Sequence, residues 1–249
     1  MQRYFAKEKV NDKLILYDTD IYHIKKVMRM NDNDKIEVVY ERKVYLCNID
    51  SISDFKISII KDLEENNELP VFVSVAIALV TEQKFDLIIQ KLTELGVSEI
   101  IPLRTERSIV KIDNNREDKK ISRWQSICKE ASEQSHRNIV PIVTNIKFIK
   151  ELENSSYDVK LVCSLTDDSK SINNYVDNSK TNSILIVIGP EGGITDKETK
   201  ELNSYGFKNL TLGKRVLRVE TAAIYVGSVI NYIYEGWISW RQLKTFIMV

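Results

Sequence analysis

Residues 188–193 read IGPEGG and residues 212–222 read LGKRVLRVETA, two glycine-bearing stretches near the C-terminal end of the chain. Six of the eight glycines of the chain fall between positions 189 and 227. Glycine is favoured where the backbone takes a positive φ or lies close to another group. The clustering therefore predicts that the chain either bends sharply or lies against a ligand there, and for residues 189–193 a simple tight turn remains the alternative.

The surroundings of the first stretch are those of a ligand loop in an α/β fold. An apolar run over 184–188 predicts a strand, and the capping box at 195–198 predicts a helix that runs to about residue 205. Ligands of such folds bind beyond the carboxyl ends of the strands. The chain lacks both G-x-G-x-x-G after an early strand and G-x-x-x-x-G-K-[ST], which argues against nicotinamide enzymes and P-loop nucleotidases.

The pattern of apolar residues divides the chain into two domains, residues 1–70 and 71–249. The first reads as a small, mostly β module, and the polar segment 64–70 reads as a linker. After Pro70, strands alternate with helices, which predicts an α/β sheet. We expect strands at 13–17, 35–40, 44–49, 55–60, 71–80, 97–103, 159–165, 184–188 and 209–212, and helices at 20–30, 83–95, 122–135, 195–205 and 220–234.

Composition narrows the class of protein. With 249 residues, 43% of them apolar, the chain can bury a proper core. Its 36 basic and 36 acidic residues cancel, which argues against a polyanion binder held by bulk charge. Three scattered cysteines and two histidines lack disulfide or metal-site spacing, so we expect free thiols and no metal. Neither a signal peptide nor a membrane-spanning stretch is visible, and we expect a cytoplasmic protein.

The two glycine stretches resemble the second and third cofactor-binding motifs of the SPOUT methyltransferases. Further matches run in order along the chain, at residues 3–5, 23–30, 91–103 and 124–141. The ordered set is similar to the bacterial 16S ribosomal RNA uridine N3-methyltransferases of the RsmE type. It departs from that family at His136, where glycine is frequent, at Val219, where threonine is frequent, and in a longer apolar tail over 237–249.

The resemblance implies a PUA-like β-barrel at the N-terminus and an α/β domain tied in a trefoil knot. It also implies a homodimer that binds S-adenosylmethionine in the knot, mostly through the backbone. Ordinary core packing remains the alternative for the side chains of Leu165, Leu212 and Leu217. The implied cofactor-binding residues are Leu165, Ile188, Gly189, Pro190, Glu191, Gly192, Gly193, Leu212, Gly213, Val216 and Leu217.

The implied reaction needs a group that stabilises negative charge on the uracil and a group that accepts its N3 proton. Arg218 suits the first role and, being always protonated, cannot be the base. Glu220 either orients Arg218 or takes the proton, and Glu133 is an alternative acceptor. A purely structural reading of Glu220, as a carboxylate favoured by the helix dipole, stays open.

The implied partner is 16S ribosomal RNA or the small ribosomal subunit. We expect its phosphates at two basic strips, one in the β module and one in the second glycine stretch. A non-catalytic RNA-binding factor on the same scaffold and a transfer RNA methyltransferase are the rival functions. The expected RNA-binding residues are Arg3, Lys25, Lys26, Arg29, Arg137, Lys214 and Arg215.

Overall fold

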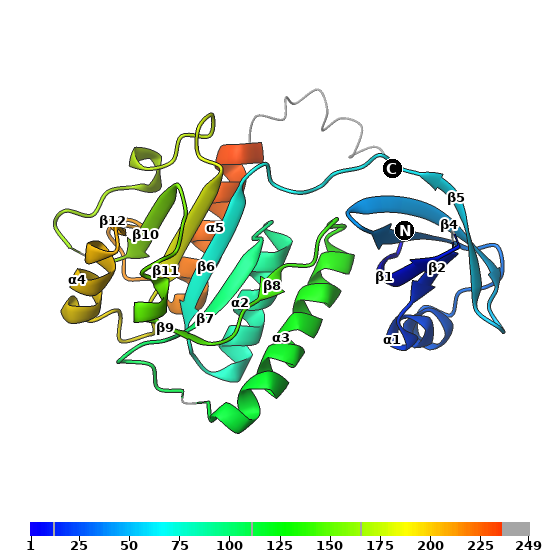
Figure 1. Ribbon diagram of the computed structural model, residues 1–249, viewed down its shortest axis with the longest axis horizontal. Coiled ribbons are helices and arrows are strands. Elements are labelled where there is room, and N and C mark those ends of the chain that lie inside the picture. Colours follow the sequence, from blue (N-terminus) through cyan, green and yellow to red (C-terminus); the bar gives the residue numbers. More distant parts are fainter. Residues whose placement is uncertain (12, 111, 165, 236–249) are drawn as a thin grey trace. The chain divides into compact units, whose positions relative to one another are not determined.

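A computed structural model describes residues 1–11, 13–110, 112–164 and 166–235 of the chain. The chain forms two units (Figure 1). The N-terminal unit contains residues 1–68 together with 129–140, and the C-terminal unit contains residues 69–128 and the chain from 141 onward. The predicted boundary near residue 70 is thus displaced by two residues, and the prediction missed that a later segment belongs to the first unit. The predicted apolar tail, 237–249, lies outside the described residues.

The C-terminal unit is built on a seven-stranded sheet in which every pair of strands is parallel (Figure 1). The strand order is β12-β10-β11-β6-β7-β8, and β9 also pairs with β7. The bounds are β6 Phe72–Ala78, β7 Glu99–Arg104, β8 Ile142–Val143, β9 Lys147–Phe148, β10 Val159–Cys163, β11 Ser183–Ile188 and β12 Lys208–Leu210.

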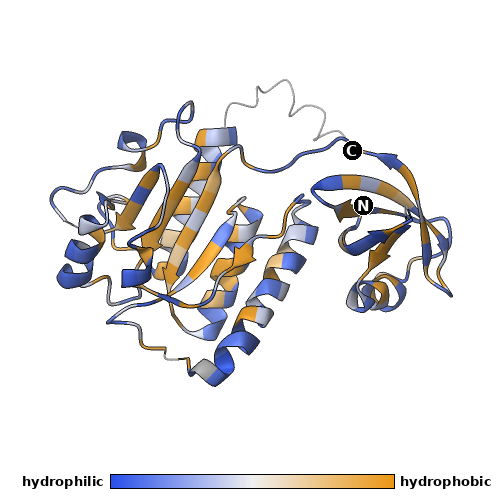
Figure 2. Ribbon diagram, viewed as in Figure 1, coloured by the Kyte–Doolittle hydropathy of each residue, from blue (hydrophilic) through white to orange (hydrophobic). Residues whose placement is uncertain are grey.

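Helices cover both faces of this sheet, which explains why its strands are almost continuously apolar (Figure 2). On one face, Ala76, Val162 and Leu185 pack with Leu152 and with Leu202 of α4. On the other face, α5 packs against β11 and against α2. The helices are α2 Glu82–Glu94, α3 Asn114–Gln134, α4 Asp196–Ser204, α5 Val219–Glu235, and the short 3-10 helices η2 Ile149–Leu152 and η3 Ile172–Asn174.

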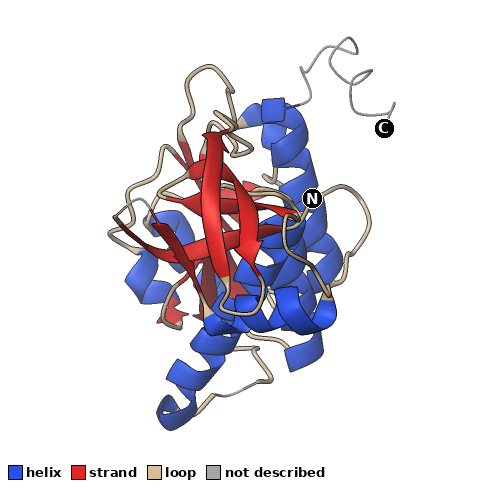
Figure 3. Ribbon diagram, turned by 90° about the vertical axis from the view of Figure 1, so that its right-hand side faces the viewer, coloured by secondary structure: helices blue, strands red, loops and turns tan. Residues whose placement is uncertain are grey.

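The N-terminal unit is a small curled sheet with the strand order β2-β1-β3-β4-β5 (Figure 3). Its outer strands, β2 and β5, contact one another, so the sheet closes on itself. The core contains Tyr4, Ile24, Ile36, Val38 and Ile49. The elements are β1 Arg3–Val10, β2 Lys13–Leu16, α1 Asp18–Tyr22, the π-helical turn η1 His23–Val27, β3 Lys35–Tyr40, β4 Lys43–Ser51 and β5 Lys56–Asp62.

Most predicted elements are confirmed, including the Thr195 to Glu198 capping box, in which Thr195 Oγ1 accepts from the amide of Glu198. The prediction missed β1, whose charged residues 7–9 hide the strand pattern, and it missed the two-residue strands β8 and β9. It also began α3 eight residues late, because residues 114–121 are mostly polar. Within the described residues, we find no helix that is both long and apolar enough to cross a membrane.

Candidate cofactor site

A cavity of about 330 Å³ lies where three neighbouring strands of the C-terminal sheet end. Strands β12, β10 and β11 are adjacent and parallel, so their carboxyl ends meet at one edge. The loops that follow them contribute Ser164 and Thr166 after β10, five residues between 189 and 194 after β11, and five residues between 212 and 217 after β12. The cavity thus occupies the place where α/β folds bind their ligands.

The loop after β11 folds back so tightly that its first residue has no room for a side chain. A Cβ on Gly189 would lie 2.9 Å from both Cγ1 and the amide nitrogen of Ile194. The amide of Gly193 donates to the carbonyl of Pro190 at 2.8 Å, and Gly193 itself has a φ of +73°. The glycines at 189 and 193 therefore shape a turn whose backbone forms the wall of the cavity. The two readings of this stretch, a tight turn and a ligand loop, are compatible.

Most of the predicted cofactor residues line this cavity. Gly192 does not, and Leu165 lies outside the described residues. Cys163, at the end of β10, also lines it, and burial raises the pKa of its thiol to about 12, so the thiol is neutral. The predicted residues that line the cavity are Ile188, Gly189, Pro190, Glu191, Gly193, Leu212, Gly213, Val216 and Leu217.

The loop after β7 supports the glycine loop from outside. The guanidinium of Arg107 donates through Nη1 to the carbonyl of Gly192 at 2.7 Å. The Arg107 side chain also lies against Gly192, where an added Cβ would approach Arg107 Cδ to 3.3 Å. Next to it, the amide of Glu106 donates to Oε1 of the buried Glu198 at 2.7 Å. Gly192 therefore shapes the loop through Arg107 and not as a lining residue.

The predicted catalytic pair stands at the start of α5, beside the cavity. Val219 and Ala222 of that helix line the cavity, and the amide of Ala222 donates to the carbonyl of Arg218 at 2.8 Å. The Arg218 side chain is exposed, and among the described residues it has no hydrogen bond or ion pair. Oε2 of Glu220 is buried and has no hydrogen-bond partner. An unpaired guanidinium and an unsatisfied buried carboxylate oxygen thus lie in the same turn, beside the cavity.

One ion pair joins the glycine loop to α2. Nζ of Lys84 lies 2.6 Å from Oε1 of Glu191, and both side chains are about one-third exposed. This hydrogen bond holds the pKa of Glu191 below its usual range and raises the pKa of Lys84. The charges of Glu220 and Arg218 also act on the Lys84 ammonium.

Sequence reasoning missed several residues of this site. Lys84 and Arg107 reach the glycine loop from elements far away in the chain, and no local motif marks them. Asp196 and Thr199 line the cavity from α4, and the capping box that starts this helix was the available signal.

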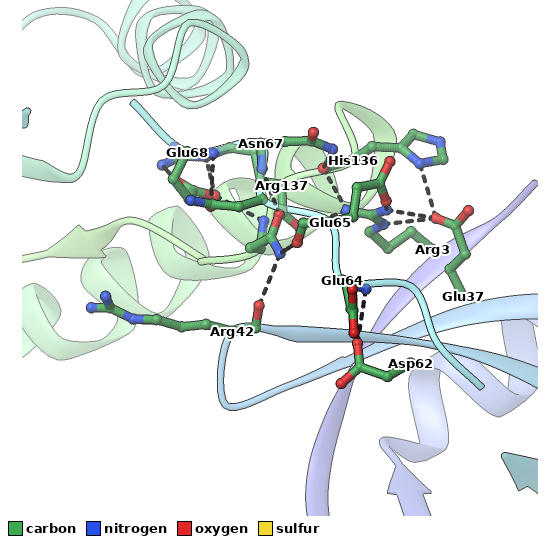
Figure 4. A network of polar contacts seen from close by, with 12 residues as sticks. Arg3, Glu37, Arg42, Asp62, Glu64, Glu65, Asn67, Glu68, His136 and Arg137 are labelled. Atoms are coloured by element: carbon green, nitrogen blue, oxygen red, sulfur yellow. Dashed lines mark hydrogen bonds and ion pairs between the residues drawn. The ribbon is translucent and has the colours of Figure 1, made fainter. Parts of the chain in front are cut away.

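The structure corrects two of the seven expected RNA-binding residues. Arg3 and Arg137 are buried, with exposed fractions of 1% and 3%. The guanidinium of Arg3 pairs with Glu37 at 2.8 Å and with Glu65 at 2.6 Å, and that of Arg137 pairs with Glu68 (Figure 4). Because these carboxylates already occupy them, the two arginines hold the N-terminal unit together and do not face solvent phosphates.

The other five basic residues are accessible to a ligand. In the N-terminal unit Lys26 and Arg29 are exposed, whereas Lys25 is half-buried and donates through Nζ to the carbonyl of Ser53 at 2.8 Å. In the C-terminal unit Lys214 and Arg215 are exposed, and Arg215 also lines the cavity.

Glu133, the alternative proton acceptor, lies elsewhere. It belongs to the N-terminal unit, where its Oε1 accepts from Nζ of Lys129 at 2.6 Å and from the amide of Phe5 at 3.3 Å. Burial raises the pKa of its carboxyl, although the hydrogen bond from Lys129 opposes this rise. Glu133 is not among the residues that line the cavity.

Comparison with known families agrees with this geometry. The RNA methyltransferase domain matches residues 67–231, and the RNA methyltransferase PUA domain matches residues 16–62. The chain therefore belongs to the RNA methyltransferase family.

Two curated relatives carry the same name, ribosomal RNA small subunit methyltransferase E. The protein from Bacillus subtilis is 39% identical, and the match covers 94% of this chain and 98% of that protein. The protein from Mesomycoplasma hyopneumoniae is 36% identical, with 91% and 97% covered. Both matches confirm the family that the ordered sequence motifs indicated.

Solved structures confirm the fold. The ribosomal RNA small subunit methyltransferase E from Neisseria gonorrhoeae, bound to S-adenosylmethionine, has a TM-score of 0.85 at 29% identity, over 94% of this chain and 98% of that one. A methyltransferase from Legionella pneumophila, in complex with the same cofactor, has a TM-score of 0.86 at 30% identity, with the same coverage. The predicted α/β domain with a PUA-like N-terminal module is thus confirmed.

Proposed function

We propose that this protein transfers the methyl group of S-adenosylmethionine to N3 of a uridine in 16S ribosomal RNA of the small subunit. Support comes from the family, from the relatives named for small-subunit ribosomal RNA, and from the cavity. The observation that carries the proposal is the pair at the start of α5, where the guanidinium of Arg218 and Oε2 of Glu220 both lack protein partners. A buried carboxylate oxygen without a partner calls for an explanation, and acceptance of the imide proton supplies one for Glu220.

The residues of the cavity fit the cofactor. A volume of about 330 Å³ lies at the lower end of the range for small-molecule sites. Its walls combine apolar side chains, such as Ile188, Leu212 and Leu217, with backbone exposed at glycines 189, 193 and 213. Such a lining suits an adenine ring beside a hydrogen-bonding polar group. When bound, S-adenosylmethionine supplies an electrophilic methyl group on a positively charged sulfur.

Arg218 and Glu220 have two different roles in the reaction at the uracil. Uridine N3 becomes a nucleophile when its imide proton leaves and the negative charge spreads onto the neighbouring carbonyl oxygens. Glu220 Oε2 accepts this proton, because it is a carboxylate oxygen with no donor of its own. Arg218 stabilises the oxygens as charge develops, because its guanidinium is always protonated and unpaired here. The nitrogen lone pair then forms the bond to the methyl carbon, and the carbon–sulfur bond breaks.

RNA binding draws on the five accessible basic residues. Lys25, Lys26 and Arg29 lie on η1 and the turn after it, and Lys214 and Arg215 border the cavity. Since the chain has no net charge, these strips supply the phosphate contacts, and RNA shape supplies the rest of the recognition. The protein is proposed to act in the cytoplasm, where ribosomal RNA is modified.

Two further proposals concern assembly. The chain from β11 to α5 is proposed to form a trefoil knot, with the cofactor loops inside it. The protein is proposed to be a homodimer through α5 and the loops of the knot. In support, α5 is apolar and buries Ala222, Val226 and Ile230 within its own unit, yet Tyr225 and Tyr232 stay exposed. These tyrosines are seven residues apart and so share one side of the helix.

The test is methylation of defined RNA in vitro. Purified protein is incubated with S-adenosylmethionine and either small subunits or naked 16S ribosomal RNA from a strain that lacks the enzyme, and the nucleosides are analysed by mass spectrometry. We expect 3-methyluridine at one position. Methylation of ribose, of another base or of transfer RNA only would contradict the proposal.

A further inference from the structure

The ion pair between Lys84 and Glu191 joins the first turn of α2 to the glycine loop. Lys84 lies in the first turn of α2, where the helix dipole disfavours a cation. Nevertheless its Nζ is 2.6 Å from Oε1 of Glu191 in the glycine loop, 107 residues along the chain. The Lys84 ammonium therefore pairs with a group of the loop and not with one of its own helix.

Glu191 needs a partner because of where it lies. It lines the cavity together with Arg215, and the two neighbours of Arg218 in the chain, Leu217 and Val219, line it as well. Among the described residues, neither arginine has a hydrogen bond or an ion pair through its side chain. Without Lys84, the Glu191 carboxylate would be free to pair with the guanidinium of Arg215 or Arg218. Arginine binds carboxylates strongly, through bidentate hydrogen bonds.

The charged groups of the site also interact with one another electrostatically. The hydrogen bond that Lys84 donates to Glu191 is the main cause that raises the pKa of Lys84, the charge of Glu220 raises it further, and that of Arg218 lowers it. Lys84, Glu191, Arg218 and Glu220 are thus one group of interacting charges, with Lys84 bound to the acidic residue that belongs to the loop.

We infer that Lys84 is a positioning residue for the reaction: it holds the Glu191 carboxylate in the glycine loop and so keeps Arg218 free to bind the uracil. This role rests on the proposed function and adds to it a residue outside the cofactor motifs. It assigns Lys84 no contact with RNA or cofactor.

The test uses K84M, in which Glu191 loses its partner. We expect kcat for methylation of small-subunit RNA to fall about fivefold, the upper limit for one competing ion pair that is partly exposed. S-adenosylmethionine affinity by calorimetry and KM for RNA should change by less than threefold. K84R, which keeps the pair, should restore most of the turnover.

The decisive variant is the double substitution K84M/E191Q. If the released carboxylate is what captures Arg218, removing its charge should return kcat to at least half of the value for E191Q alone. The matched control is K91M on the same helix, because Lys91 is equally exposed (36%) and pairs with Glu94 at 2.8 Å, away from the cavity. It should methylate like the unaltered protein.

Three results would overturn the inference. A rise in KM for RNA without rescue by E191Q would make Lys84 a phosphate contact. Loss of cofactor affinity equal to the loss of turnover would make the ion pair a brace for the cavity only. Unchanged kcat in K84M would show that Glu191 needs no partner. Absence of methylation by the unaltered protein is a separate outcome, which contradicts the proposed function instead.

Discussion

The guanidinium of Arg3 donates through Nε to a carboxylate oxygen of Glu37 at 2.8 Å, across two neighbouring strands of the N-terminal unit. The Arg3 side chain is fully buried, and its other nitrogens bond to Glu65 and to the carbonyl of His136 (Figure 4). The arginine thus connects β1, the segment after β5 and the segment after α3 within one network. It has a structural role in a position where sequence similarity suggested contact with RNA.

Substitution of Arg3 should therefore reduce stability. R3M leaves the carboxylate of Glu37, 13% exposed, without its buried partner, and breaking such a pair costs about 3 kcal/mol. Urea unfolding followed by tryptophan fluorescence and circular dichroism measures the change. R29M, at an exposed cation, is the control and should unfold like the unaltered protein. Equal stability of R3M and R29M would contradict the structural role.

Cofactor binding should depend on the glycine at position 189. A Cβ there would lie 2.9 Å from the backbone nitrogen of Ile194, so G189A must shift the loop that forms the cavity wall. We expect calorimetry in the presence of EDTA to detect S-adenosylmethionine binding to the unaltered protein and at least tenfold weaker binding to G189A, since a shift of the wall loses about 1.4 kcal/mol or more. No binding heat for the unaltered protein at millimolar cofactor would contradict the cofactor proposal.

Removal of the Arg218 guanidinium should affect turnover and little else. The side chain has no partner among the described residues, so R218A should unfold normally and bind cofactor normally. Loss of one preorganised charge stabiliser lowers kcat by about two to three orders of magnitude. Single-turnover methylation measures this loss. If R218A lost thermal stability but kept its turnover, Arg218 would instead be structural.

RNA affinity should fall when the exposed basic residues of the N-terminal unit are removed. K26M/R29M deletes two such cations, and the slope of log affinity against log salt should become shallower by about 0.7 to 0.9 for each lost phosphate contact. Filter binding to small-subunit RNA at salt concentrations from about 50 to about 300 mM measures this slope. An unchanged slope would place the phosphates elsewhere.

The K26M/R29M variant tests the N-terminal unit more directly than a truncation near Pro70 would. Residues 129–140 belong to that unit, so a chain that starts at Pro70 would leave the buried Arg137 and Asn138 without their partners Glu68 and Glu65. Lost methylation by a truncated chain would then report misfolding as readily as lost RNA binding.

Dimerisation should depend on the exposed side of α5. Y225E/Y232E places two charges on tyrosines that are 46% and 74% exposed, so the fold of one chain should tolerate them. If α5 forms a two-fold interface, light scattering at micromolar concentration should show a dimer for the unaltered protein and a monomer for the variant. A monomeric unaltered protein that methylates RNA would contradict the dimer proposal.

The sequence predicted those parts of the fold that local patterns specify. The continuous apolar run at 184–188 identified β11, and the Thr195 to Glu198 capping box identified the start of α4. The glycines of the loop after β11 identified the cavity, because the constraint on Gly189 comes from Ile194, only five residues away.

The remaining features arise from pairs that are distant in sequence. Arg3 was taken for a surface residue because its partners Glu37 and Glu65 lie 34 and 62 residues away. Lys84 was overlooked because Glu191 is 107 residues away. The position of β12 beside β10, and not beside β11, likewise follows from packing of the complete sheet and from no local signal.

The interleaving of the two units along the chain affects how the protein is made. The first 68 residues leave the ribosome before the segment 129–140 that completes their unit. Until that segment emerges, Arg3 lacks the carbonyl of His136 that it binds at 2.6 Å, and Glu68 lacks Arg137. Domains generally fold as units during synthesis. Here the N-terminal unit is complete only after β6, α2, β7 and α3 have been translated, whereas β8 to α5 of the C-terminal unit follow later still.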